Sequence, residues 1–182
     1  SYRTGVTQAK VVTLVPPRLS AETILGEVTS DKPVDTGANT FHIATESIDN
    51  HKKLIIHCTS AGSASWTNAW GAVEEAITLF KAQNTDKDTP IRIIGAGCVG
   101  LATAAKLAHQ GYNVVGITTK DLYDTPSWHA AGYFAWIPPN APAEEQAAIE
   151  RINVATLKAY REIAQGTCPY LTQDTVQMMP VY

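Results

Sequence analysis

Three glycines, Gly95, Gly97 and Gly100, form a G-x-G-x-x-G pattern between the apolar run 91–94 and an Ala/Leu-rich segment. In a strand-to-helix turn, the first glycine permits a tight turn, the second lets the backbone approach a pyrophosphate, and the third lets the helix pack closely on the strand. The first N–H groups of the helix and its positive dipole end favour a phosphate. The pattern therefore predicts a dinucleotide site with contacts from Gly95, Gly97, Cys98, Val99 and Gly100.

The end of the next apolar run, 112–118, is where such a site carries an acidic residue for the ribose hydroxyls. Thr118, Thr119 and Lys120 stand there instead, and the first acid is Asp121. The lysine would favour a phosphate. A phosphorylated nicotinamide cofactor therefore stays open as an alternative, and so does a site that has decayed.

The segments around the glycines alternate between strand and helix patterns. Strands are predicted at 53–58, 91–94 and 112–118, with further candidates at 11–15, 40–44 and 176–181. Helices are predicted at 66–82, from the glycines to about Gln110, and at 142–164. Residues 91–118 have the size of a β-α-β unit with parallel strands. The sequence thus predicts an α/β, Rossmann-like fold with a parallel sheet and flanking helices.

Two of the predicted helices have an apolar face at helical spacing. The face of 66–82 consists of Trp70, Val73, Ile77 and Phe80. The face of 142–164 consists of Ile149, Ile152, Leu157, Tyr160 and Ile163. These residues are the predicted core positions.

A second candidate stretch, Ser127-Trp128-His129-Ala130-Ala131-Gly132, follows the Thr125-Pro126 turn. It resembles the segment that passes the flavin in the D-amino-acid oxidase and glycine oxidase family of FAD-dependent oxidoreductases, and Ala-Ala-Gly is the closest match. Small residues let a backbone come near a ring system, and hydroxyls can donate to phosphate or ribitol. The resemblance implies cofactor contacts from Thr125, Ser127, Ala131 and Gly132; an ordinary surface loop is the alternative.

Residues 57–80 resemble the signature that the same family carries near its C-terminus. The matching places are Gly62, Thr67, Trp70-Gly71, Glu75-Ala76 and Leu79-Phe80. The resemblance implies that a loop and a helix N-terminus face the pyrimidine side of the flavin, with contacts from Gly62, Ser63, Ala64, Ser65, Trp66 and Thr67. The family's loop is richer in glycine and contains a histidine, which this loop lacks. Because this signature precedes the Gly95 pattern here, the resemblance implies a circularly permuted order.

The resemblance divides the chain into four parts. These are 1–52 with partial substrate-domain-like strands and an irregular segment, the strand-loop-helix 53–82 of the FAD-binding domain, a polar connector 83–90, and the dinucleotide-binding core with its following helix and strand at 91–182. Arg3-Thr4-Gly5 resembles the end of the family's substrate domain, but Thr7 occupies the place of its carboxylate-binding arginine. We expect an incomplete chain, whose substrate-domain segment or second chain supplies the other wall of the site. No catalytic side chain can be assigned.

Composition and residue spacing argue against nucleic-acid binding, a membrane-spanning helix and a metal site. The 182 residues carry a net charge of −3, which argues against nucleic acid as a partner. No apolar run approaches the roughly 20 residues of a membrane-spanning helix. The three cysteines lack C-x-x-C spacing and the histidines lack metal-ligand spacing, so we expect no zinc or other metal site and a cytoplasmic setting.

The sequence therefore favours the FAD-binding portion of an oxidoreductase. By resemblance, its substrate is a small molecule, an amino acid or amine, whose C–N bond is oxidised by hydride transfer to flavin. An NAD(P)-binding Rossmann protein is one alternative. A non-catalytic remnant that binds a partner protein is another.

Overall fold

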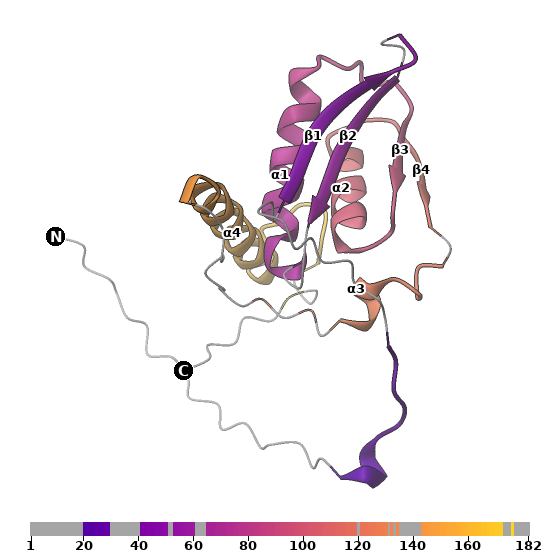
Figure 1. Cartoon of the computed structure of the whole chain (residues 1–182), viewed down its shortest axis with the longest axis vertical. Helices are drawn as coiled ribbons and strands as arrows, with labels where there is room; N and C mark the ends of the chain where they lie inside the picture. Colours follow the sequence, from indigo (N-terminus) through magenta and orange to yellow (C-terminus); the bar gives the residue numbers. More distant parts are fainter. Residues whose placement is uncertain are drawn as a thin grey trace, which may run out of the picture.

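The computed structural model describes residues 20–29, 41–50, 53–60, 65–119, 121–130, 132, 134, 143–172 and 176 (Figure 1). The candidate strand at 11–15, the candidate strand at 176–181 beyond Val176, and residues Arg3 and Thr7 lie outside the described residues. So do five predicted site residues, Gly62, Ser63, Ala64, Lys120 and Ala131.

Helix α1 (Ser65–Ala82) lies at the centre of the packed part of the molecule (Figure 1). It contacts helix α4 (Ala143–Ala164), helix α2 (Cys98–His109) and the strands β1 (Phe41–Ile48) and β2 (Lys53–Ser60). The predicted core face of α1 is confirmed, since Trp70, Val73, Ile77 and Phe80 are all buried. Every residue from Thr67 to Val73 is buried, as expected of a helix that has neighbours on all sides.

The α1–α4 crossing is unusually close at Gly71. A Cβ atom at this position would overlap the backbone carbonyl of Ile152. The Gly71 N–H donates to Thr156 Oγ1 at 2.8 Å, and the Tyr160 hydroxyl donates to the Trp66 carbonyl at 2.7 Å. Two hydrogen bonds between α1 and α4 therefore hold the first half of α1 in place, and part of the predicted site lies there.

The β-α-β prediction is confirmed. Strands β3 (Ile91–Ile94) and β4 (Val114–Thr118) pair in parallel, and α2 connects them and packs against both. The pair of Lys106 and Glu74 joins α2 to α1. Residues of β3, β4 and α2, including Ile93, Val114 and Leu107, extend the core around α1.

The strand predicted at 53–58 has a different environment from the one expected. It is β2, which is half-buried and pairs antiparallel with β1 instead of joining a parallel sheet. Asp49 and Asn50 adopt left-handed backbone angles and reverse the chain after β1, and such a short connection places the two strands side by side. Within the described residues, the molecule thus has two two-stranded sheets instead of one parallel sheet.

The remaining elements are short or close to their predicted ranges. The 3-10 helix η1 (Ala21–Thr23) and the helix α3 (Pro126–His129) lie in stretches where no helix is predicted from the sequence. On α4, Ile149, Ile152, Tyr160 and Ile163 are buried as predicted, and Leu157 is half-buried. Within the described ranges, no helix has the length and apolar character needed to cross a bilayer.

We predict that Gly71→Ala lowers the free energy of unfolding by about 2–4 kcal/mol, because the added methyl group forces α1 and α4 apart. Chemical denaturation measures this change. Gly26→Ala is the matched control, since a Cβ atom there meets nothing within 4 Å, and we expect a change below about 0.5 kcal/mol. Equal stability of the two variants would contradict the close crossing.

Cys58 provides a second prediction. Its thiol donates to the Ala72 carbonyl at 3.6 Å, and burial raises the pKa of Cys58 to about 11. Only on the order of 0.1% of this thiol is thiolate at pH 8. We expect alkylation of Cys58 by iodoacetamide to be slow at pH 8 and to accelerate up to about pH 11, as read by peptide mass spectrometry.

The urea-denatured protein is the control for this measurement, because there Cys58 should react as an ordinary thiol. The folded protein holds the thiol proton more tightly than the unfolded chain does. The stability from this group is therefore present below the unfolded pKa and lost as the pH rises through about 11. A reaction rate that levels off near pH 9 would show that the pKa is not raised.

Candidate functional site

Two of the three pattern glycines are required by the turn between β3 and α2. Gly95 has a φ of 99°, a left-handed conformation that favours glycine, and its N–H donates to the Thr118 carbonyl at 2.8 Å. A Cβ atom on Gly100 would overlap the Gly95 carbonyl oxygen and lie 3.4 Å from Ile93 Cγ2. The turn thus seats the N-terminus of α2 directly beside the carboxyl end of β3.

The third glycine, Gly97, lies against Ser127 of α3. A Cβ atom on Gly97 would be 3.0 Å from Ser127 Oγ, and this oxygen accepts a hydrogen bond from the Cys98 N–H at 3.0 Å. The Thr125 hydroxyl oxygen in turn accepts from the Trp128 N–H at 3.3 Å and caps α3. The structure therefore brings together two groups of predicted site residues, the glycine loop and the Thr125–Ser127 turn.

The first turn of α1 also lies close to the part of the chain that follows α3. Gly132 has a φ of 65°, and a Cβ atom there would be 4.0 Å from Cε2 of Trp66, in the first turn of α1. Ser65 is the first residue of α1, and Thr67 is buried within its first turn. Residues from 57–80 and from 125–132 that were predicted to contact one ligand are therefore neighbours.

Tyr160 of α4 connects the two halves of this region. Its hydroxyl donates to the Trp66 carbonyl. Burial, with a smaller contribution from the nearby Cys98 thiol, raises the pKa of Tyr160 above its usual value. The hydroxyl therefore keeps its proton and remains a donor over the physiological pH range. Sequence reasoning counted Tyr160 only as a core residue, because its spacing on α4 is that of the apolar face.

The end of β4 differs from the acidic pattern, as the sequence indicates. Thr118 and Thr119 are exposed there, and the Thr119 hydroxyl donates to the Asp121 carbonyl at 3.3 Å. The Asp121 carboxylate accepts from the Tyr123 N–H at 2.9 Å, so it stabilises a local turn. At the end of β4, the described residues therefore offer hydroxyl groups for a ribose.

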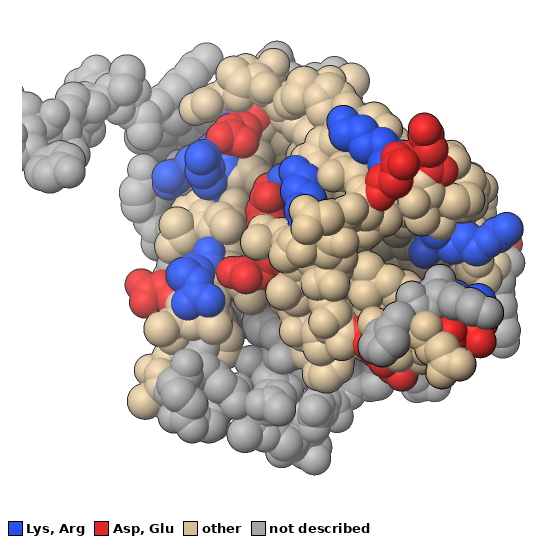
Figure 2. Space-filling model, turned by 90° about the horizontal axis from the view of Figure 1, so that it is seen from above, with Lys and Arg blue, Asp and Glu red and all other residues tan. Residues whose placement is uncertain are grey.

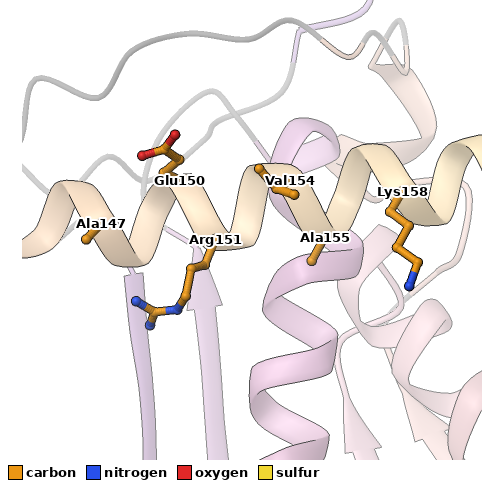
Figure 3. A pocket seen from close by; sticks show the side chains of 6 residues that line it. All are labelled: Ala147, Glu150, Arg151, Val154, Ala155 and Lys158. Atoms are coloured by element: carbon orange, nitrogen blue, oxygen red, sulfur yellow. The ribbon is translucent and has the colours of Figure 1, made fainter. Parts of the chain in front are cut away.

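A depression of 520 Å³ lies on α4, away from these residues (Figure 3). Among the described residues, the side chains that line it all come from this helix: Ala147, Glu150, Arg151, Val154, Ala155 and Lys158. Its described lining contains no predicted site residue and comes from a single helix, so we assign no ligand to it.

The distribution of charged side chains indicates no second candidate site. On the face shown in Figure 2, Lys and Arg side chains are interspersed with Asp and Glu, without an extended patch of either sign. In the part of the chain that the structure describes, no three His, Cys, Asp or Glu side chains are grouped as metal ligands.

One of the comparisons with known proteins gives a match, and it covers the region around the glycines. The family model DAO, FAD dependent oxidoreductase, matches residues 91–180. This stretch includes the β3–α2–β4 unit, α3 and α4. No curated protein and no solved structure matches the chain. Residues 91–180 are thus similar to the FAD-dependent oxidoreductases.

Proposed function

We propose that this chain forms the FAD-binding portion of an oxidoreductase that oxidises the C–N bond of an amino acid or amine. The observation that carries the proposal is the contact between the N-terminus of α2 and Ser127, together with the approach of Gly132 to Trp66. Predicted ligand contacts from three separate stretches of sequence lie next to one another in the fold. The family match to residues 91–180 supports the choice of FAD.

The residues present fit the phosphate end of such a cofactor. Gly95 and Gly100 let α2 begin close to β3, so the first N–H groups of α2 form a site suited to a pyrophosphate. Ser127 Oγ accepts from the Cys98 N–H, and its own O–H remains available to donate to a phosphate oxygen. Trp66 adds a buried N–H that has no acceptor among the described residues.

The residues present fit the ribose of FAD less well, because Thr118 and Thr119 stand where the pattern has an acid. This feature favours the second candidate function, an NADP-binding protein, with Lys120 as the phosphate ligand. The two candidates differ in the role of α1. An NADP site requires only the glycine loop and the end of β4, whereas the FAD site also uses Trp66 and Gly132.

When bound, FAD would accept the hydride that leaves the substrate. In this proposal, the chain's own residues bind and orient the cofactor. The glycine loop, Ser127 and the N-terminus of α2 hold the phosphates. The first turn of α1, fixed by Tyr160, and Gly132 lie at the ring. The substrate class rests on the family resemblance, and the substrate-binding side chains are assigned to a further segment or chain.

We also propose that the chain order is permuted relative to this family, with the 83–90 connector joining α1 to β3. The connector is well anchored. The Asn113 N–H donates to the Lys87 carbonyl at 2.9 Å, and the Asn113 amide donates to the Asp88 carbonyl at 3.1 Å. These bonds attach the connector to the residue that precedes β4, which supports α1 and the β-α-β unit as parts of one domain.

The test of the cofactor assignment is a binding comparison with FAD, ADP and NADP⁺ by calorimetry, after a visible spectrum of the purified protein. We expect FAD to bind most tightly, ADP more weakly, and NADP⁺ not measurably. Gly97→Val should weaken FAD binding at least tenfold, about 1.4 kcal/mol, because its side chain displaces Ser127 and blocks the phosphates.

Gly26→Val is the matched control, since Gly26 has open space around it and lies outside the predicted site. Its FAD affinity should equal that of the unsubstituted chain. Tight NADP⁺ binding without FAD binding would replace the proposal with the nicotinamide alternative. Failure to bind all three nucleotides would support the non-catalytic remnant.

Ser127→Ala gives a second prediction for the same site. It removes the acceptor of the Cys98 N–H and the hydroxyl donor, so we expect about five- to tenfold weaker binding of both FAD and ADP. The ligand-free variant should also lose about 1 kcal/mol of stability. Tighter nucleotide binding would instead show that Ser127 competes with the phosphate for the N-terminus of α2.

A further inference from the structure

The indole N–H of Trp66 is a buried donor that has no hydrogen-bond acceptor in the described part of the chain. Such groups are rare in native proteins, because a buried donor without an acceptor costs about 1–3 kcal/mol. The indole of Trp66 is held in place. Its ring packs against the core around α1, and its backbone carbonyl accepts from the Tyr160 hydroxyl at 2.7 Å.

The unpaired N–H lies near Gly132. Cε2, which is bonded to Nε1, is the atom that a Cβ atom on Gly132 would approach to 4.0 Å. Since Gly132 has a φ of 65°, a side chain at this position is disfavoured on backbone grounds as well. The donor therefore lies near a residue that has no side chain, and this residue follows the last residue of α3 by three positions.

We propose that Trp66 donates its indole N–H to a carbonyl oxygen or ring nitrogen of the isoalloxazine ring of the bound FAD. This inference rests on the proposed function and names a ligand contact within it. The phosphate half is accounted for by the N-terminus of α2 and by Ser127. Trp66 is a single neutral donor on an aromatic ring, with Phe134 and Tyr160 packed in the same region at a ring separation of 5.9 Å. These surroundings suit a planar ring that carries acceptors rather than a phosphate.

The proposal also predicts an effect on the redox properties of the bound ring. A donor to a ring carbonyl stabilises the electron-rich, reduced state more than the oxidised state. Trp66→Phe, which keeps an aromatic side chain and removes the N–H, should therefore lower the midpoint potential of the bound flavin. A side chain with a purely structural role would leave this potential unchanged.

The direct test is a ¹H–¹⁵N spectrum of the four tryptophan indole groups, recorded with and without FAD or ADP. We expect the Trp66 signal to move with FAD and to stay in place with ADP. Trp66→Phe identifies the signal. If this variant does not fold, the spectra of Trp70→Phe, Trp128→Phe and Trp136→Phe assign it by exclusion.

Binding measurements give the second readout. Trp66→Phe should weaken FAD binding about five- to tenfold and leave ADP binding unchanged, as expected for the loss of a hydrogen bond to the ring half. Trp70→Phe is the matched control, because Trp70 lies on the same helix but packs against Tyr170 at a ring separation of 6.0 Å. Its FAD affinity should stay within twofold of the unsubstituted value.

The outcomes separate this inference from the proposed function. If FAD binds while the Trp66 signal and the affinity of Trp66→Phe are unchanged, the indole contact is wrong and the FAD site stands. If ADP moves the Trp66 signal, the indole lies at the adenosine diphosphate half and the inference is overturned. If neither FAD nor ADP binds, the proposed function is wrong, and the Trp66 contact falls with it.

Discussion

The close crossing of α1 and α4 at Gly71 positions the rest of the candidate site. Because Gly71 has no side chain, the Ile152 backbone approaches α1 directly, and Thr156 and Tyr160 reach hydrogen-bond partners on α1. Tyr160 holds the turn that contains Trp66. The same α4 residue lies near the Cys98 thiol at the start of α2. Tyr160 thus lies close to two helix N-termini that come from separate parts of the sequence.

The second constraint is the fit of α3 against α2. Ser127 occupies space that a side chain at position 97 would take, and its oxygen serves as the acceptor for the first N–H of α2. The absence of a side chain at Gly97 therefore has a role even without a ligand. A glycine pattern of this type can be retained by packing alone, so the pattern is weaker evidence for a dinucleotide than the combination of Gly97, Ser127 and the orphaned Trp66 donor.

The sequence predicted the parts of the fold that depend on local periodicity. The buried face of α1 and the β3–α2–β4 unit follow from 3.6-residue spacing and from the glycines between a strand and a helix. The pairing of β2 was not predictable in this way, because strand partners depend on long-range contacts and on the left-handed turn at Asp49 and Asn50. Tyr160 was missed as a site residue for a related reason, since its apolar spacing hides the hydroxyl that reaches Trp66.

The chemistry available at the described part of the candidate site follows from its lack of charged side chains. Its described residues are glycines, hydroxyl residues, Cys98, Val99 and Trp66, and none of them carries a full charge. The negative charge of a pyrophosphate would then be balanced by backbone N–H groups and the positive end of α2, which act only over the first turn of the helix. Such binding depends on the direction of each hydrogen bond more than on distance to a cation. The placement of α2, set by Gly100 against Gly95 and by Ser127, would therefore decide how well the described residues bind a phosphate.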